Sequence, residues 1–304
     1  MKKIAISTTT FGEYDRSCIK RCEDLGFEVV MNRHGRKIKP DELVELAGNA
    51  VGLIAGTEEL TGEVMSKLPG LKVISRCGAG IENVNLDAAK KLGIKVFNTP
   101  DAPTLAVAEL AIGLIMNLLR KINMADRGIR NGEWKKPMGN LLTGKKIGII
   151  GFGRIGKKAA ELLSGFNCQV AYYDPHVEGR ASGFKKLELK ELLKVSDIVS
   201  IHAAAKEELL GAEELGLMKR GSLLVNLARG GAVNEGALYE NLKKGILAGA
   251  ALDVFGEEPY KGALKELDNV ILTPHIGSYA KEARISMECE AVDNLLNGLK
   301  EGVK

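Results

Sequence analysis

The sequence predicts an α/β fold in which two doubly wound parallel sheets share one chain. Short β-rich runs alternate with segments of helical periodicity along almost all of the 304 residues. The chain has 36 glycines, which suit many tight turns between strands and helices, and it is 45% hydrophobic, which is enough for large cores. Alternation of this kind is typical of right-handed βαβ units around parallel sheets.

The first third of the chain contains the first strand–helix series. The predicted strands are Lys3–Ser7, Glu28–Met31, Val51–Ala55, Leu71–Ser75 and Lys95–Phe97. Helical spacing predicts helices near Asp15–Leu25, Pro40–Ala47, Thr61–Lys67 and Leu86–Lys91. We therefore expect one parallel sheet in this region.

The run from Pro103 to about Arg130 has a different pattern. Pro103 suits a helix N-terminus, and apolar residues follow at helical spacing from Leu105 to Leu119. We expect one long apolar helix, which needs a large partner surface. Glu109 and Asn117 interrupt its longest apolar stretch, which is also too short for a membrane span.

A second strand–helix series opens at Lys145. The predicted strands are Lys146–Ile150, Gln169–Tyr173, Ile198–Ile201, Ser222–Asn226, Gly249–Leu252 and Val270–Leu272. A helix follows the first of these strands, and a final helical stretch runs from about Lys281 to Leu299. We place the joints between the two domains near Asn98–Pro103 and Gly277–Glu282 and expect a cleft between them.

Composition and charge disfavour several classes of protein. The net charge is +4 and the basic residues are scattered, which argues against a nucleic-acid patch. The first apolar run is too short for a signal peptide. The five cysteines have irregular spacing without a CxxC pair; Cys18 and Cys22 would share one helix face as small buried residues. This cysteine pattern fits a reducing cytoplasmic compartment, and we expect no metal site.

One motif indicates the cofactor. A buried strand runs directly into Gly151-Phe152-Gly153-Arg154-Ile155-Gly156 and then into a helix, which is the context that gives G-x-G-x-x-G its meaning. The glycines permit the turn, the approach of a pyrophosphate and close helix packing. Asp174 ends the next strand, 18 residues beyond Gly156, where its carboxylate can bind ribose hydroxyls and repel a 2′-phosphate. The motif therefore predicts NAD rather than NADP.

Three later segments, each following a strand, carry an arginine, an acid and a histidine. They are Asn226–Gly231, Asp253–Pro259 and Thr273–Gly277. His275 can be the base for a hydroxyl proton, Glu258 can orient it, and Arg229 can hold a carboxylate or carbonyl oxygen. Each residue alone is ambiguous, but strand C-terminal ends line the ligand crevice of such sheets. The set predicts oxidation of a 2-hydroxy acid.

With these motifs the chain resembles the D-isomer-specific 2-hydroxyacid dehydrogenases, most closely their phosphoglycerate-dehydrogenase-like branch. The resemblance covers nearly the whole chain and is detailed from about Val51 to Ser278. The matching segments are Val73–Val84, Asn98–Pro100, Ala108–Leu110, Gly151–Gly156, Asn226–Gly231, Glu258–Pro259 and Thr273–Gly277.

The resemblance implies roles for particular residues. The catalytic residues are Arg229, Glu258 and His275. The cofactor-binding residues are Thr104, Gly151, Gly153, Arg154, Ile155, Gly156, Asp174, Leu227, Ala228, Asp253, Gly277 and Ser278, with Asp253 reaching the nicotinamide carboxamide. The substrate-binding residues are Arg76, Cys77, Gly78, Ala79 and Gly80, whose backbone from Cys77 to Gly80 holds the substrate carboxylate.

The resemblance also implies the domain plan. Residues 1–99 and 281–304 form a flavodoxin-like substrate domain, and residues 100–280 form an NAD-binding Rossmann domain. A long helix over 104–130 usually builds a homodimer in this family. The chain leaves no room after Lys304 for the regulatory domain of longer phosphoglycerate dehydrogenases, so we expect no serine feedback.

Departures from the family pattern leave the substrate open. Ala55–Glu59 is neutral to acidic where phosphoglycerate dehydrogenases often carry an arginine, although Arg76 matches a second phosphate-contacting position. The candidate substrates are 3-phosphoglycerate, glyoxylate, hydroxypyruvate and other 2-oxo acids. Cys77 is expected to be a small packing residue. The loop after Ile201 is short; its Lys206 would lie near the phosphates, and its His202 is expected to be structural.

Two other functions remain as alternatives. An NADH-sensing protein related to the C-terminal-binding-protein corepressors would keep the same Arg, Glu and His, and would bind the cofactor with little turnover. A formate dehydrogenase fits less well, because that family places Gln where this chain has Glu258.

Overall fold

The chain forms two compact units in a computed structural model that describes residues 1–178, 181–205 and 207–300. Unit 1 combines Met1–Pro103 with Tyr279–Lys304, and unit 2 is Thr104–Ser278. Each unit has its own parallel sheet with helices on both faces, which confirms the predicted fold class. Lys206, and residues 301–304 of the range expected for the substrate domain, lie outside the described residues.

Unit 1 contains a parallel sheet in the order β2-β1-β3-β4-β5. Its strands are β1 (Lys2–Ile6), β2 (Phe27–Met31), β3 (Ala50–Ala55), β4 (Val73–Arg76) and β5 (Lys95–Asn98). Its helices are α1 (Ser17–Asp24), α2 (Pro40–Ala47), α3 (Gly62–Ser66), α4 (Leu86–Lys91) and α11 (Lys281–Lys300). Strand order reverses between β1 and β3, which makes this pair the switch point of the sheet.

The two faces of the unit 1 sheet carry separate apolar layers. Helices α2, α3 and α4 cover one face, with Leu43 and Met65 buried against the strands. Helices α1 and α11 cover the other face, where Leu295 of α11 packs on Gly52 of β3. Both ends of the chain are therefore needed to bury this sheet, because α11 supplies much of one layer.

Unit 2 contains a second parallel sheet in the order β12-β11-β10-β9-β6-β7-β8. Its strands are β6 (Lys146–Ile150), β7 (Gln169–Tyr173), β8 (Lys185–Lys186), β9 (Ile198–Ile201), β10 (Leu223–Asn226), β11 (Gly249–Leu252) and β12 (Val270–Leu272). Its helices are α5 (Thr104–Arg120), α6 (Ile122–Arg130), α7 (Arg154–Ser164), α8 (Leu189–Val195), α9 (Ala212–Leu217) and α10 (Glu235–Lys243), with short 3₁₀ turns at Gly230–Ala232 and Ala263–Glu266.

The core of unit 2 also forms two layers. Helices α5 and α7 pack on one face through Ile115 and Leu163, and α8, α9 and α10 pack on the other through Leu192 and Leu238. The apolar stripe of α5 therefore faces the sheet of its own unit. Strands β10, β11 and β12 are neighbours, so the loops that follow them lie at one edge of the sheet.

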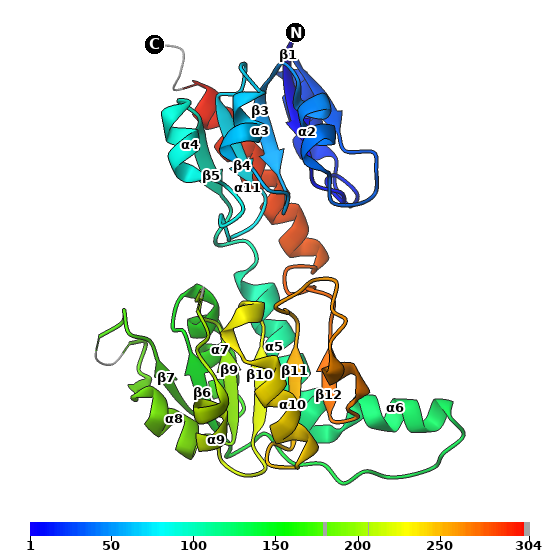
Figure 1. Ribbon diagram of the computed structural model, residues 1–304, viewed down its shortest axis with the longest axis vertical. Helices are drawn as coiled ribbons and strands as arrows, with labels where there is room; N and C mark the ends of the chain where they lie inside the picture. Colours follow the sequence, from blue (N-terminus) through cyan, green and yellow to red (C-terminus); the bar gives the residue numbers. More distant parts are fainter. Residues whose placement is uncertain (179–180, 206, 301–304) are drawn as a thin grey trace. The chain divides into compact units, whose positions relative to one another are not determined.

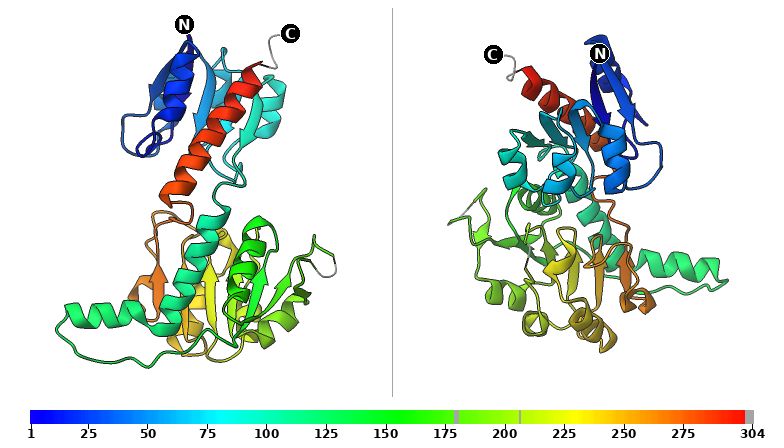
Figure 2. Two further views of the ribbon diagram at one scale, coloured as in Figure 1. Left: turned by 180° about the vertical axis from the view of Figure 1, so that it is seen from behind. Right: turned by 45° about the horizontal axis from the view of Figure 1, so that its top comes forward.

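The single helix expected over residues 104–130 is wrong, because the chain forms two helices there. Lys121, with φ 53° and ψ 39°, adopts the left-handed conformation, which ends α5 and redirects the chain into α6. The side chain of Asn117 accepts a hydrogen bond from the Asn123 amide at 2.9 Å and so satisfies the start of α6. Figure 2 shows α6 projecting from the rest of unit 2.

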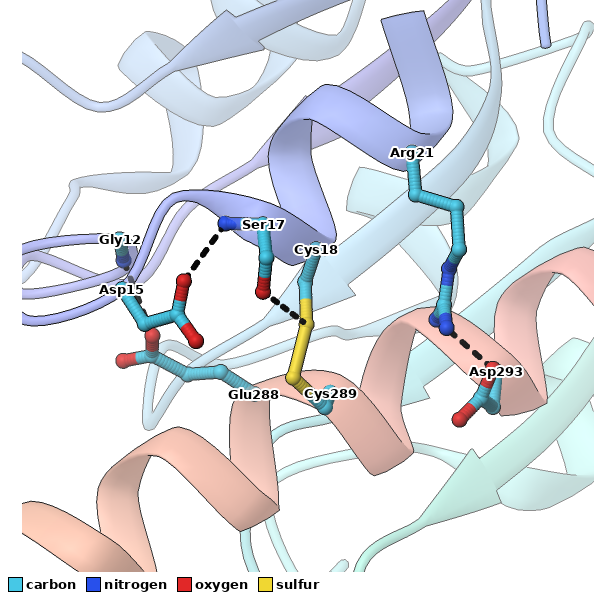
Figure 3. Close-up of a disulfide and its surroundings, with 8 residues drawn as sticks. All are labelled: Gly12, Asp15, Ser17, Cys18, Arg21, Glu288, Cys289 and Asp293. Atoms are coloured by element: carbon cyan, nitrogen blue, oxygen red, sulfur yellow. Dashed lines mark hydrogen bonds and ion pairs between the residues drawn. A yellow bond between two sulfur atoms is a disulfide. The ribbon is translucent and has the colours of Figure 1, made fainter. Parts of the chain in front are cut away.

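The sequence predicts Cys18 only as a small buried residue and predicts no disulfide, but the structure contains one. Cys18 of α1 forms a disulfide with Cys289 of α11, with 5.5 Å between their Cα atoms (Figure 3). Arg21 and Asp293 pair beside it at 2.7 Å. The two cysteines are 271 residues apart in sequence, and only the packing of α11 against α1 brings them together. Cys22 is buried on the same helix, as predicted.

No helix among residues 1–178, 181–205 and 207–300 combines the length and the apolar character that crossing a membrane requires.

Candidate active site

The glycine loop predicted to bind the cofactor joins β6 to α7. Gly151 has φ 89°, which favours glycine, and a Cβ on Gly156 would clash with the Gly151 carbonyl oxygen. Gly153 caps α7, and nothing lies within 4 Å of where its Cβ would be. Arg154, Ile155 and Gly156 form the first turn of α7, whose N–H groups carry partial positive charge. Open space at an anion-binding helix end fits a pyrophosphate.

Asp174 lies at the end of β7, beside this loop. Its Oδ2 accepts the Phe152 amide at 2.7 Å, and its Oδ1 accepts the His176 amide at 2.8 Å. Each carboxylate oxygen has a second lone pair for a ribose hydroxyl. The Phe152 amide of the glycine loop therefore fixes the carboxylate of Asp174, so that the predicted ribose contact is held next to the glycine loop.

Four other predicted cofactor residues, Leu227, Ala228, Thr104 and Ser278, also belong to unit 2. Leu227 and Ala228 are buried after β10, and the Ala228 amide donates to Asn226 Oδ1 at 3.1 Å. Thr104 begins α5, and its hydroxyl is shielded from solvent and has no hydrogen-bond partner among the described residues. Ser278 is half-buried after the turn that carries His275.

A single buried carboxylate holds the turn that carries His275. Asp253 is 1% exposed at the end of β11. Its Oδ1 accepts the Thr273 hydroxyl at 2.5 Å and the Ile276 amide at 2.8 Å, and its Oδ2 accepts the Gly277 amide at 2.8 Å. These bonds bracket His275, which has φ 55°, an uncommon conformation for a residue other than glycine. Asp253 therefore fixes the backbone from which the imidazole extends.

His275 and Glu258 form a close pair. His275 Nδ1 lies 3.0 Å from Glu258 Oε2, and both side chains are exposed to solvent. The other carboxylate oxygen of Glu258 accepts the Phe255 amide at 3.2 Å, which steadies the acid. A hydrogen bond from Nδ1–H to a carboxylate leaves Nε2 as the nitrogen that can take a proton. The described residues contain no cluster of three or more His, Cys, Asp or Glu that could hold a metal ion.

Arg229 follows β10, the strand next to β11. The Asn226 side chain donates to the Arg229 carbonyl at 2.9 Å, and Arg229 Nη1 donates to the Ala228 carbonyl at 2.8 Å. A Cβ on Gly230 would clash with the Phe255 carbonyl group, so the loops after β10 and β11 touch at this glycine. Thus Arg229, Asp253, Glu258 and His275 all extend from the carboxyl ends of adjacent strands.

His202 differs from His275 in its surroundings. Its Nε2 forms a hydrogen bond with the Ser200 hydroxyl at 2.9 Å. Its Nδ1 is shielded from solvent and has no hydrogen-bond partner among the described residues. Burial lowers the pKa of His202 to about 4. A histidine that stays neutral at neutral pH fits the structural role predicted for it.

The residues predicted to hold a substrate carboxylate follow β4 in unit 1. The Gly78 amide is already bonded to Thr99 Oγ1 at 2.7 Å, and the Cys77 amide donates to the Ala55 carbonyl at 2.8 Å. Ala79 and Gly80 are more exposed, and no hydrogen bond between described residues uses their amides. This loop can therefore offer the Ala79 and Gly80 amides to an anion, rather than all those from Cys77 to Gly80.

Arg76 and Cys77 support this loop. Arg76 Nη1 donates to the Cys77 carbonyl at 2.8 Å and would clash with a Cβ on Gly78, so the guanidinium lies over that glycine. Cys77 is 4% exposed, and burial raises the pKa of its thiol to about 12. Cys77 is thus a buried packing residue, as predicted, and its thiol stays protonated.

Comparison with known proteins identifies the family. The family model described as "D-isomer specific 2-hydroxyacid dehydrogenase, NAD binding domain" matches residues 112–277, which include the glycine loop and the His275 turn. The chain belongs to the D-isomer specific 2-hydroxyacid dehydrogenase family. NAD is therefore its cofactor, as the glycine loop and Asp174 predicted.

Individual members of the family show similarity along most of the chain. D-3-phosphoglycerate dehydrogenase of Homo sapiens is 38% identical over 93% of this chain, which spans only 54% of that protein. Glyoxylate reductase of Pyrococcus furiosus is 39% identical over 91% of this chain and 87% of its own length. The crystal structure of the TT0316 protein from Thermus thermophilus matches 98% of this chain and 97% of its own, with 35% identity and a TM-score of 0.92.

Some residues that shape this candidate site were not singled out in the sequence. Thr273, Asn226 and Thr99 lie inside quoted motifs, but their side-chain bonds depend on the folded positions of their partners. Glu235 accepts the Gly256 amide at 2.8 Å and supports the loop that carries Glu258. No local pattern marks Glu235, because its partner lies 21 residues away.

Proposed function

We propose that the chain catalyses reversible hydride transfer between NAD(H) and C2 of a small D-2-hydroxy or 2-oxo acid. The observation that carries this proposal is the His275–Glu258 pair, with 3.0 Å between Nδ1 and Oε2, on loops of the sheet that also bears the cofactor loop. A histidine oriented by a carboxylate is the group that proton transfer to or from a hydroxyl needs.

The proposed chemistry assigns one task to each side chain. NAD(H), held by the glycine loop and Asp174, would supply the hydride acceptor for oxidation and the hydride donor for reduction. His275 Nε2 takes the hydroxyl proton during oxidation and gives it back to the ketone oxygen during reduction. Glu258 holds Nδ1–H and stabilises the imidazolium, and Asp253 holds the turn. Arg229 orients the substrate through a carboxylate or carbonyl oxygen. Within unit 1, the Ala79 and Gly80 amides are the groups open to a carboxylate.

Two observations favour different substrates. Arg76 beside the carboxylate loop and the similarity to D-3-phosphoglycerate dehydrogenase favour 3-phosphoglycerate, which would place the chain in serine biosynthesis. The acidic loop after β3 and the similarity to glyoxylate reductase over most of that protein's length favour an unphosphorylated acid such as glyoxylate or hydroxypyruvate.

The test is NADH oxidation with phosphohydroxypyruvate, hydroxypyruvate, glyoxylate and pyruvate in parallel. Turnover of any of them supports the dehydrogenase, and the preferred substrate decides between the two classes. NADH binding without turnover of any of them would contradict the proposal and favour the NADH-sensing alternative.

We also propose that the chain is a homodimer that associates through α6 and the segment after it. Apolar side chains gather there without burial: Ile122 is 53% exposed, Ile129 54%, Trp134 82% and Met138 84%. A patch of this kind marks an interaction surface. The wild-type chain should have the mass of a dimer in light scattering, and Ile129→Asp should give a monomer. A monomeric wild type would contradict this proposal.

A cytoplasmic location, expected from the sequence, stays a prediction that cell fractionation can test.

A further inference from the structure

The sheet of unit 1 has a switch point between β1 and β3, because the chain continues to opposite sides from these two neighbouring strands. In doubly wound sheets the crevice at the carboxyl ends of such strands is where ligands bind. The loops that surround it here begin at Ser7 after β1 and at Gly56 after β3. A backbone amide and a hydroxyl at this place are groups that would bind an anion.

In this protein the side chain of Glu58 accepts hydrogen bonds from both of these groups. The Gly56 amide lies 3.1 Å from both carboxylate oxygens of Glu58, and the Ser7 hydroxyl donates to Oε1. Glu58 is 4% exposed, and a Cβ on Gly56 would lie 3.0 Å from its Oε2. The carboxylate is therefore packed directly on the loop amide, in the position of a bound anion.

The loop of Glu58 is fixed to the loop predicted to bind the substrate carboxylate. The Asn83 side chain donates to the Gly56 carbonyl at 3.2 Å and to the Glu58 carbonyl at 2.6 Å, and the Leu60 amide donates to the Asn83 carbonyl at 2.8 Å. The Cys77 amide also donates to the Ala55 carbonyl at 2.8 Å. These bonds fix the loop after β3 to both ends of the segment that contains Ala79 and Gly80.

The charge of Glu58 has no local counterpart. Residues 56–60 contain two glutamates and no cation, and none of the ion pairs found among the described residues involves Glu58. Arg76 lies over Gly78 at the start of the neighbouring loop, where it supports the carboxylate-binding backbone. The β3 loop consequently presents only negative charge. A like charge nearby in a poorly solvated place disfavours a second anionic group.

We propose that Glu58 determines substrate specificity by occupying the anion position of the β1/β3 switch point. It restricts the site to 2-oxo acids with one negative charge and excludes those that carry a phosphate at the far end. This inference rests on the proposed dehydrogenase activity and selects one of its two substrate classes.

Hydroxypyruvate and phosphohydroxypyruvate are the matched substrates for the test, because they differ only by the phosphate. The wild type should have the higher kcat/KM with hydroxypyruvate. Glu58→Gln keeps the shape of the side chain and removes its charge, so the ratio of the two kcat/KM values should shift toward phosphohydroxypyruvate by about tenfold or more.

Glu59→Gln is the control, because it makes the same charge change at the exposed neighbouring residue. Its ratio should stay within about twofold of the wild-type ratio, since exposed charges are well screened. If Glu58→Gln does not fold by circular dichroism, the wild-type ratio at low and high ionic strength gives a second test. Exclusion by charge predicts that added salt moves the ratio toward phosphohydroxypyruvate.

The outcomes separate this inference from the function on which it rests. A wild type that prefers phosphohydroxypyruvate, or a folded Glu58→Gln variant with an unchanged ratio, would overturn the role of Glu58 and leave the dehydrogenase intact. A wild type that reduces neither of these acids, nor glyoxylate or pyruvate, would overturn both.

Discussion

The two units use the same architecture differently at the carboxyl edges of their sheets. In unit 2, no atom lies within 4 Å of where a Cβ of Gly153 would be, so the space in front of the N-terminus of α7 is open. In unit 1, the amide of Gly56 at the switch point is covered by Glu58. Topology thus places a possible ligand site, and the side chains of the loops decide whether a ligand or the chain itself fills it.

The largest effect is expected from His275→Ala in unit 2. Loss of the group that moves the proton should lower kcat by about 10²–10⁴-fold, while NADH binding changes little. Steady-state kinetics and NADH fluorescence titration measure the two quantities. His34→Ala, at an exposed site in unit 1, is the control and should behave like the wild type. Wild-type turnover of His275→Ala would remove the basis for placing the chemistry in unit 2.

The second histidine of unit 2 should affect stability rather than chemistry. The pKa of His202 is about 4 in the fold, below its ordinary value of 6.5. Its contribution to stability is therefore complete above pH 6.5 and is lost as the pH falls toward 4, by up to about 3 kcal/mol. His202→Gln should lose less stability over this range in urea unfolding. Parallel curves for both proteins would show that folding does not lower the pKa of His202.

The variant Asp253→Asn should show whether Asp253 positions His275 or binds the cofactor. The variant loses acceptor capacity for the Thr273, Ile276 and Gly277 donors, so the turn should loosen and kcat should fall by about 10²-fold. Hydrogen exchange at the Ile276 and Gly277 amides should become faster, and the Kd for NADH should change little.

Thr273→Val, which removes one of the three donors, serves as the partial control and should have a smaller effect on kcat. A weaker Kd for NADH in Asp253→Asn, with unchanged amide exchange, would instead assign Asp253 to the nicotinamide, as the resemblance implied.

The smallest effect is expected at the ribose. Asp174→Ala removes the carboxylate that should repel a 2′-phosphate, so the preference for NADH over NADPH should fall by about tenfold. The ratio of kcat/KM for the two cofactors measures it. Because Asp174 also binds the Phe152 amide, Asp174→Asn tests whether loss of that bond alone disturbs the loop. An unchanged ratio in both variants would mean that other residues select the cofactor.

Local sequence was sufficient where a residue's role depends on its neighbours in the chain. The strand–Gly151–Gly156–helix unit was predicted because the turn, the close packing and the helix end follow one another directly. The break at Lys121 was not predicted, because apolar spacing continues past it and the bond from Asn123 to Asn117 leaves no periodic signal. The disulfide was missed for a similar reason: Cys18 and Cys289 come from opposite ends of the chain.

The fold class, the glycine loop and the candidates Arg229, Glu258 and His275 could be predicted from the sequence, because strand–helix alternation and motif spacing are properties of short segments. The folded structure was needed to show how Asp253 holds the His275 turn, which amides after β4 are open, and that Glu58 covers the amide of Gly56. These depend on hydrogen bonds between loops that the sheet brings together, and such contacts have no fixed spacing along the chain.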